Sequence, residues 1–130
     1  MDPYKPIVMP VVAADQCFVN SERSFSTLPP VSRAYASAMT ALRLVKAKTY
    51  SFIAENQAAH QTACFNSIGL AAQNKIKLVC NITVPISLGK VTNASIDAWR
   101  AAIDTISQCE QDVVVMCAYS TSALVMLKRA

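Results

Sequence analysis

The chain has 130 residues and a mass of 14.0 kDa, the size of one ordinary domain, so we expect a single domain over residues 1–130. Hydrophobic residues make up 53% and charged residues 15%, more apolar surface than a small monomer buries comfortably. We therefore expect an oligomer. The net charge of +4 suits a nucleic-acid partner or a mildly basic surface equally well, and the absence of repeats and charge blocks argues against solenoids and disordered tails.

Neither terminal region predicts membrane insertion. Residues 6–14 are apolar, but Pro6 and Pro10 interrupt them, so we do not expect a signal peptide. Residues 113–127 are uncharged but fall short of the roughly 20 apolar residues that a membrane helix needs. We expect a soluble protein with no membrane partner.

The first half of the chain gives an ambiguous pattern. Residues 7–13 and 17–25 look extended and predict a hairpin or an arm, and Pro29-Pro30 then marks an element boundary. A helical stripe and several alanines favour a helix over residues 31–45. Residue types in 42–46, 49–53 and 64–68 favour strands instead, so residues 31–74 remain open between helix and strand.

Residues 75–86 show the clearest alternation in the chain. Their even positions are apolar, whereas most odd positions are polar or cationic, which predicts a strand with one face on a core. The polar face is either solvated or a nucleic-acid surface, because its side chains suit phosphates and base edges. A second basic cluster, Arg43, Lys46 and Lys48, extends the same surface if it lies on a neighbouring strand. Tyr50 would then either stack on a base or pack in the core. The candidate RNA-binding residues are Lys75, Lys77, Asn81, Thr83, Arg43, Lys46 and Lys48.

A helix is predicted from about residue 94, because the side-chain oxygens of Thr92, Asn93 and Ser95 can cap its N-terminus. The apolar stripe of this helix would pack in the core or across a dimer, and the Trp99 indole would bury the largest apolar area. The stripe consists of Ile96, Trp99, Ile103 and Ile106. Residues 112–127 form either a second helix or a strand at 113–117 followed by a helix, and the helix is preferred.

No catalytic constellation is visible, and neither a metal nor a cofactor is expected. The five cysteines are an odd number without CxxC spacing, so we interpret them mainly as reduced, small apolar residues. His60 is the only histidine, four residues before Cys64, and this pair is the only basis for an enzyme hypothesis. A packed cysteine beside an incidental histidine is the preferred interpretation.

The order of elements resembles the coat proteins of small icosahedral single-stranded RNA bacteriophages of the levivirus type. Residues 81–86 are similar to the end of the last strand in that family. A polar loop, the capped helix with residues 94–99 and a shorter apolar segment from Val113 follow in the same order.

This resemblance implies an α+β fold with an N-terminal hairpin, an antiparallel β-sheet and two C-terminal helices that pack across a dimer. It implies a structural capsid protein rather than an enzyme, one that self-assembles into a shell in the host cytoplasm and resides in the virion. The implied partners are a second copy of the chain and viral single-stranded or hairpin RNA on the inner sheet face, with no small-molecule substrate. The rival hypothesis is a mostly helical adaptor or regulatory module that binds a protein partner through residues 31–45 and 94–108.

Overall fold

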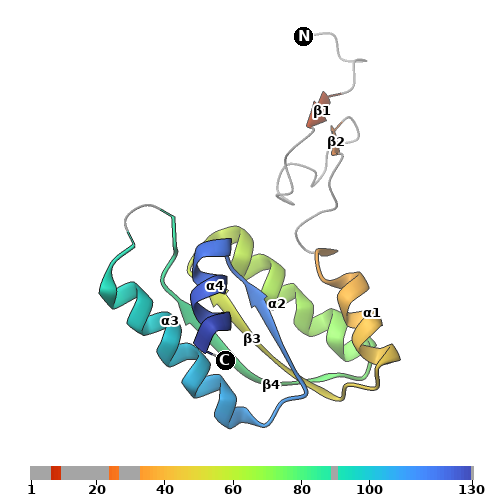
Figure 1. The fold of residues 1–130 in the computed structure, drawn as a ribbon. Coiled ribbons are helices and arrows are strands. Elements are labelled where there is room, and N and C mark those ends of the chain that lie inside the picture. The colour runs from red at the N-terminus through yellow and green to blue at the C-terminus, as the bar shows by residue number, and fades with distance from the viewer. Residues whose placement is uncertain (1–6, 10–23, 27–32, 89–90, 130) are drawn as a thin grey trace.

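The computed structural model describes residues 7–9, 24–26, 33–88 and 91–129, and its centre is a three-stranded parallel sheet. The strands are β3 (Thr49–Glu55), β4 (Lys77–Val84) and β5 (Val113–Cys117), in the spatial order β4-β3-β5 (Figure 1). β3 pairs with both neighbours, and its residues from Tyr50 to Glu55 are all buried. Burial on both faces is typical of a central parallel strand covered by helices.

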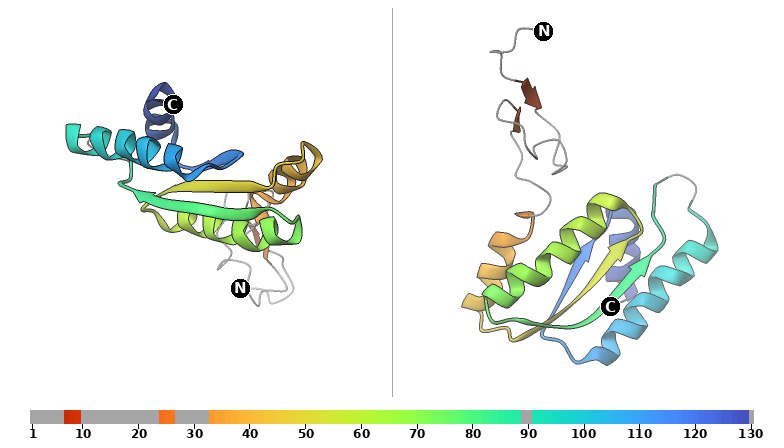
Figure 2. Two further views of the ribbon diagram at one scale, coloured as in Figure 1. Left: turned by 90° about the horizontal axis from the view of Figure 1, so that it is seen from below. Right: turned by 180° about the vertical axis from the view of Figure 1, so that it is seen from behind.

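Helices cover both faces of the sheet. Helix α2 (Ala58–Gln73) connects β3 to β4, and α3 (Asn93–Ile106) with the short helix η3 (Ser107–Cys109) connects β4 to β5. The two crossovers run in opposite directions along the sheet, so right-handed connections place α2 and α3 on opposite faces. Helix α4 (Ser120–Arg129) packs beside α3, while α1 (Ala36–Leu44) packs against α2 (Figure 2).

Each face of the sheet has its own core. On the α2 face, Tyr50, Phe52 and Met39 are buried together, and Tyr35 of the segment before α1 packs against them. On the other face, residues of α3 and α4 pack on Ile53 and Val84; they are Trp99, Ala102, Ile103, Ile106 and Met126. Trp99 is fully buried, and its Nε1 donates a 2.8 Å hydrogen bond to the Pro85 carbonyl. The predicted helix is present as α3, and Trp99, Ile103 and Ile106 of its stripe are buried, with Ile96 packed at the margin.

The predicted antiparallel sheet is wrong, because both connections between the sheet strands are helical crossovers and every strand pair is parallel. Residues 64–68 belong to α2 rather than to a strand. The N-terminal hairpin is also wrong where it can be compared, since β1 (Ile7–Met9) and β2 (Ser24–Ser26) pair in parallel. The remaining residues of that expected hairpin lie outside the described part. At the C-terminus, β5 precedes α4, so the preference for an uninterrupted helix over 112–127 is wrong.

The alternation in residues 77–84 is confirmed, with exposed odd positions along most of β4. However, the register against β3 shifts after Tyr50, so that Leu78 pairs with Tyr50 but Asn81 pairs with Phe52. Leu78 packs in the core on the α2 face, whereas Cys80 and Ile82 pack in the core on the α3 face. Since alternation restarts after such a bulge, the predicted single polar face is divided between Lys77 and the later residues.

Four cysteines form two disulfides, so the expectation of reduced cysteines is wrong for them. Cys64 of α2 joins Cys117 of β5, and Cys80 of β4 joins Cys109 of η3, with Cα atoms 6.0 and 6.2 Å apart. Cys17 lies outside the described residues. None of the helices in the described part combines the length and apolar character that a membrane crossing requires.

Candidate functional site

The carboxyl ends of the parallel strands meet at one edge of the sheet. From the end of β3 the chain turns to α2 on one face, and from the end of adjacent β5 it turns to α4 on the other. Open α/β sheets bind ligands at such a switch point, outside the carboxyl ends of the strands. Glu55, the last residue of β3, is fully buried there.

The Glu55 carboxylate collects hydrogen bonds from both neighbouring strand ends. Its Oε1 accepts from the backbone N–H of Ser87 at 3.1 Å and from the Ser122 hydroxyl. Its Oε2 accepts from the backbone N–H of Tyr119 at 3.0 Å. One carboxylate therefore fixes the loop after β4, the turn after β5 and the first turn of α4.

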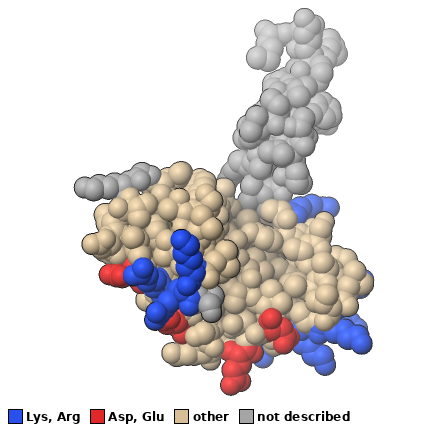
Figure 3. All heavy atoms as spheres, in the orientation of Figure 1, with Lys and Arg blue, Asp and Glu red and all other residues tan. Residues whose placement is uncertain are grey.

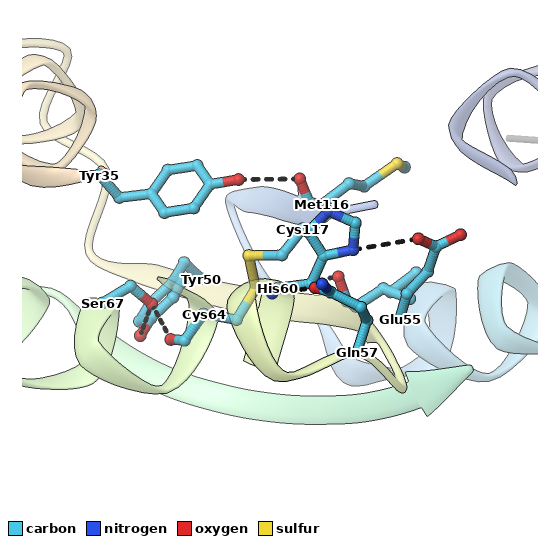
Figure 4. Close-up of a disulfide and its surroundings, with 10 residues drawn as sticks. Tyr35, Tyr50, Glu55, Gln57, His60, Cys64, Ser67, Met116 and Cys117 are labelled. Atoms are coloured by element: carbon cyan, nitrogen blue, oxygen red, sulfur yellow. Dashed lines mark hydrogen bonds and ion pairs between the residues drawn. A yellow bond between two sulfur atoms is a disulfide. The ribbon is translucent and has the colours of Figure 1, made fainter. Parts of the chain in front are cut away.

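His60 approaches the same carboxylate from the first turn of α2. Its Nδ1 lies 3.0 Å from Glu55 Oε2, which is ion-pair distance for a protonated imidazole, and makes no hydrogen bond with a described residue (Figure 4). The ring meets that of Tyr119 at 4.5 Å between centroids and an interplanar angle of 64°. The N-cap residue of α2, Gln57, accepts the backbone N–H of His60 through its Oε1 at 3.0 Å. His60 and Tyr119 thus lie side by side above the buried acid.

Burial raises the pKa of Glu55, but the hydrogen bonds from Ser122 and from the N–H groups of Tyr119 and Ser87 outweigh it and leave the pKa below its ordinary value. The carboxylate is therefore ionised at neutral pH, and both of its oxygens accept hydrogen bonds from the protein itself. Neither α2 nor α4 has an acidic residue in its own first turn, but the ionised Glu55 carboxylate accepts the Tyr119 N–H at the start of α4 and so lies at the N-terminus of that helix. The buried Ser87 hydroxyl also has no hydrogen-bond partner. The N-terminus of α2 and the Ser87 hydroxyl are therefore the groups that favour an anion at this edge.

The Cys64–Cys117 disulfide lies beside His60, on the side away from Glu55 (Figure 4). Cys64 is one turn after His60 on α2, and Cys117 comes two residues before Tyr119. The disulfide therefore holds the two ring-bearing segments together. It also overturns the Cys64–His60 enzyme hypothesis in its proposed form, because Cys64 is not a free thiol nucleophile.

The predicted RNA-binding residues all lie outside this network. Arg43, Lys46, Lys48, Lys75 and Lys77 are exposed near the amino ends of the strands, whereas the carboxyl ends carry the site. Asn81 and Thr83 are exposed on β4, an edge strand. Tyr50 is fully buried and shares a 3.0 Å hydrogen bond with Ser67, so it offers no stacking surface.

The residues of the Glu55 network were not identified from the sequence. The one usable signal was Glu55 itself, a single acid that ends an otherwise uncharged β-type run. Its partners are 32 to 67 residues away along the chain, and no local pattern connects them.

Two cavities lie elsewhere, along α3 and α4. One of about 490 Å³ is lined by Ile103, Val114, Met116 and Leu127 among others, and another of about 390 Å³ by Ile96, Arg100 and Val125 among others. Neither cavity is lined by a buried polar side chain among the described residues, so the carboxyl edge is the better candidate despite its open surface.

No protein-family model matches the chain, and no curated protein matches its sequence. Solved structures do match its fold. A protein from Rhodospirillum rubrum assigned to a branched-chain amino acid ABC transporter superimposes with a TM-score of 0.76 at 12% identity, over 94% of this chain and 33% of that protein. A solute-binding protein of an ABC transporter from R. palustris, in complex with benzoate, gives 0.71 at 18% identity over 95% and 32%. A periplasmic binding protein from Burkholderia mallei gives 0.70 at 12% identity over 91% and 28%.

The chain therefore has the fold of part of these solute-binding proteins and spans about a third of their length. The resemblance to levivirus coat proteins is wrong, because that family's sheet is antiparallel and this one is parallel with helical crossovers. The implied capsid function, the viral RNA partner, the virion location and the absence of a small-molecule ligand are overturned with it.

Proposed function

We propose that this chain forms one wall of a small-molecule binding site, as a single folded lobe of a solute-binding protein rather than as an enzyme. The observation that carries the proposal is the Glu55 network at the switch point between β3 and β5, with His60 and Tyr119 above it. A rigid sheet edge that presents rings, backbone N–H groups and a helix N-terminus can bind a ligand without performing chemistry on it. The opposite wall would come from another part of a longer chain or from a second chain.

We propose a small carboxylate as the ligand. The N-terminus of α2 and the Ser87 hydroxyl favour a negative group, and Glu55, the acid of the network, is buried. Branched-chain amino acids and benzoate, named for two of the similar structures, both carry a carboxylate next to an apolar body. The paired rings of His60 and Tyr119 suit such a body.

The two disulfides support an extracytoplasmic location for this function, because disulfides persist in oxidising compartments such as the bacterial periplasm. The periplasmic location of a similar structure agrees with this.

The test is a thermal-shift titration of the full chain with leucine, valine and benzoate. A ligand at about ten times its Kd stabilises the folded state by about 1.4 kcal/mol, which raises Tm by several degrees. We expect saturable shifts that His60→Ala removes and Lys128→Ala, at an exposed position on α4, retains. Shifts with none of the three ligands, or equal shifts in His60→Ala, would reject the proposal.

A further inference from the structure

The three turns that lead into the sheet strands share one backbone shape and differ in charge. Lys46, Lys75 and Glu110 all have positive φ, at 63°, 60° and 53°. Each is followed two positions later by a second charged residue just before or at the start of a strand, giving Lys-x-Lys before β3, Lys-x-Lys before β4 and Glu-x-Asp before β5. Since the strands are parallel, all three turns lie at the amino edge of the sheet, opposite the Glu55 network.

The basic side chains of this edge face solvent. Arg43, Lys46, Lys48, Lys75 and Lys77 are exposed, and none forms an ion pair with another described residue. The neighbouring Asp112 carboxylate, exposed on the same edge, accepts the N–H groups of Lys48 and Thr49 at 2.7 and 3.0 Å. Figure 3 shows cationic side chains gathered at the lower right, with acidic groups beside them. The edge therefore carries an excess of positive charge on the β3 and β4 side.

Two protruding aliphatic side chains stand among these cations. Leu44, the last residue of α1, and Val45 are each 73% exposed, the most exposed large apolar residues of the described part. They lie between Arg43 and Lys46 in the sequence. Single exposed apolar residues are common on proteins, but an adjacent pair inside a cluster of five cations is a distinct surface. We call Arg43, Leu44, Val45, Lys46, Lys48, Lys75 and Lys77 the amino-edge patch.

We propose that the amino-edge patch docks on an anionic lipid membrane. Leu44 and Val45 enter the boundary between headgroups and acyl chains, while the lysines and the arginine contact the anionic headgroups. Neither contribution is sufficient alone, because two aliphatic side chains bury little area and basic residues are screened by salt. The combination is typical of reversible peripheral binding. The patch has no exposed aromatic ring for base stacking, which argues against single-stranded nucleic acid as its partner.

This orientation leaves the candidate ligand site free. The Glu55 network is at the carboxyl edge, so docking through the amino edge turns it away from the bilayer. The expectation of no membrane partner rested on the length needed to cross a bilayer, and that length does not bear on surface docking. The proposal does not depend on the ligand-binding function.

The test is co-sedimentation of the full chain with vesicles of phosphatidylcholine alone and of phosphatidylcholine with about 30% phosphatidylglycerol. We expect binding to the anionic vesicles only, weakened on raising the salt from about 0.1 M to 0.5 M. The double variants Leu44→Ser/Val45→Ser and Lys75→Glu/Lys77→Glu should each bind at least about tenfold more weakly. Glu110→Lys should bind about fivefold or more tightly, because Lys46 and Lys75 already hold the same backbone conformation.

Matched controls come from α4, where Leu124 is 57% exposed and Lys128 is also exposed. The double variant Leu124→Ser/Lys128→Glu should bind as the wild type does, and circular dichroism of every variant should show unchanged secondary structure. The proposal is overturned by equal binding to both kinds of vesicle, by equal losses in the control, or by wild-type binding in Leu44→Ser/Val45→Ser. Lipid-independent self-association that the patch variants abolish would instead identify a second copy of the chain as the partner.

Discussion

The backbone N–H of Tyr119 donates a 3.0 Å hydrogen bond to the carboxylate of Glu55, 64 residues earlier in the chain. This bond ties the turn after β5 to the end of β3, and the Ser87 N–H ties the loop after β4 to the same carboxylate. Three loops that would surround a ligand are therefore held by one buried acid. Such a constraint gives a binding edge its rigidity, since loops alone are mobile.

Replacing that acid by its amide should destabilise the fold. In Glu55→Gln the side chain keeps its size, but its NH₂ group faces donors and leaves at least one of them unpaired. A buried donor without a partner costs about 1–3 kcal/mol, and loss of charge-assisted bonds adds to this, so we expect the free energy of unfolding to fall by about 2–4 kcal/mol. Urea unfolding followed by circular dichroism measures the change. The exposed Glu110→Gln should be within about 0.5 kcal/mol of wild type.

The same carboxylate should make stability depend on pH in the acid range. The pKa of Glu55 is lowered in the folded state from an ordinary value of 4.5. The unfolded chain then binds the proton first, so the contribution of Glu55 is complete above pH 4.5 and is lost as pH falls through the folded-state pKa. We expect the difference in unfolding free energy between wild type and Glu55→Gln to shrink below that pH. A difference that stays constant down to the acid limit would contradict the assignment.

The sequence predicted the elements with strong local patterns and missed their arrangement. Alternation identified the strand that is β4, and the stripe with Trp99 identified α3. The sequence did not reveal that residues 58–73 are a helix between two strands, because that segment has buried Ser67 and Cys64 but exposed Phe65 and gives no clean apolar stripe. The antiparallel sheet was implied only by the resemblance to levivirus coat proteins, and without that helix nothing in the sequence indicated a parallel pair.

The candidate site could not be predicted from the sequence for a different reason. Glu55, Ser87 and Ser122 come from three separate segments, and only the parallel order β4-β3-β5 brings them together. The cations lie at the amino edge because the turns before β3 and β4 carry them, whereas Asn81 and Thr83 lie further along β4. Disulfides were missed because cysteine spacing carries no information about which Cα atoms approach to about 6 Å.

Removal of either disulfide should lower stability, and the loss should rise only slowly with the length of chain that the disulfide closes. Cys64–Cys117 spans 53 residues and Cys80–Cys109 spans 29. Loop-closure entropy gives about 4 kcal/mol for the first and about 3.6 kcal/mol for the second. We expect the double variants Cys64→Ala/Cys117→Ala and Cys80→Ala/Cys109→Ala to lose similar amounts, measured by urea unfolding. Peptide mapping without reductant should recover both linked pairs, and any other pairing would contradict the assignment.

Only the first of these disulfides should affect the candidate site. Cys64 and Cys117 lie next to the segments that carry His60 and Tyr119, whereas Cys80 and Cys109 join β4 to η3. Any thermal shift caused by a ligand should therefore decrease more in Cys64→Ala/Cys117→Ala than in the other double variant. Equal decreases would show that the disulfide has no particular role in holding the two rings.

Trp99 should report directly on the packing of α3. It is the only tryptophan of the chain, fully buried, and its Nε1 donates to the Pro85 carbonyl. Trp99→Phe keeps an aromatic ring but loses this hydrogen bond and leaves space, so we expect a loss of about 2 kcal/mol. Trp99→Ala should lose about 3–5 kcal/mol. The wild-type emission should be blue-shifted and move to the red on unfolding, and an emission typical of a solvated indole in the folded protein would contradict the burial.

Lys75 lowers stability through its positive φ and contributes a charge to the amino-edge patch, and one substitution distinguishes these two effects. It follows the C-cap of α2 with φ of 60°, its N–H donates to the Ala72 carbonyl, and the next N–H, that of Ile76, donates to the Ala71 carbonyl. This is a Schellman motif, in which glycine is preferred because a side chain in the left-handed region costs about 1 kcal/mol or more. Lys75→Gly should therefore raise the free energy of unfolding by about 0.5–1 kcal/mol in urea titrations. The same variant removes one charge from the amino-edge patch, so its binding to anionic vesicles should weaken while its fold becomes more stable. A variant that is both less stable and equally well bound would contradict the backbone assignment and the surface role together.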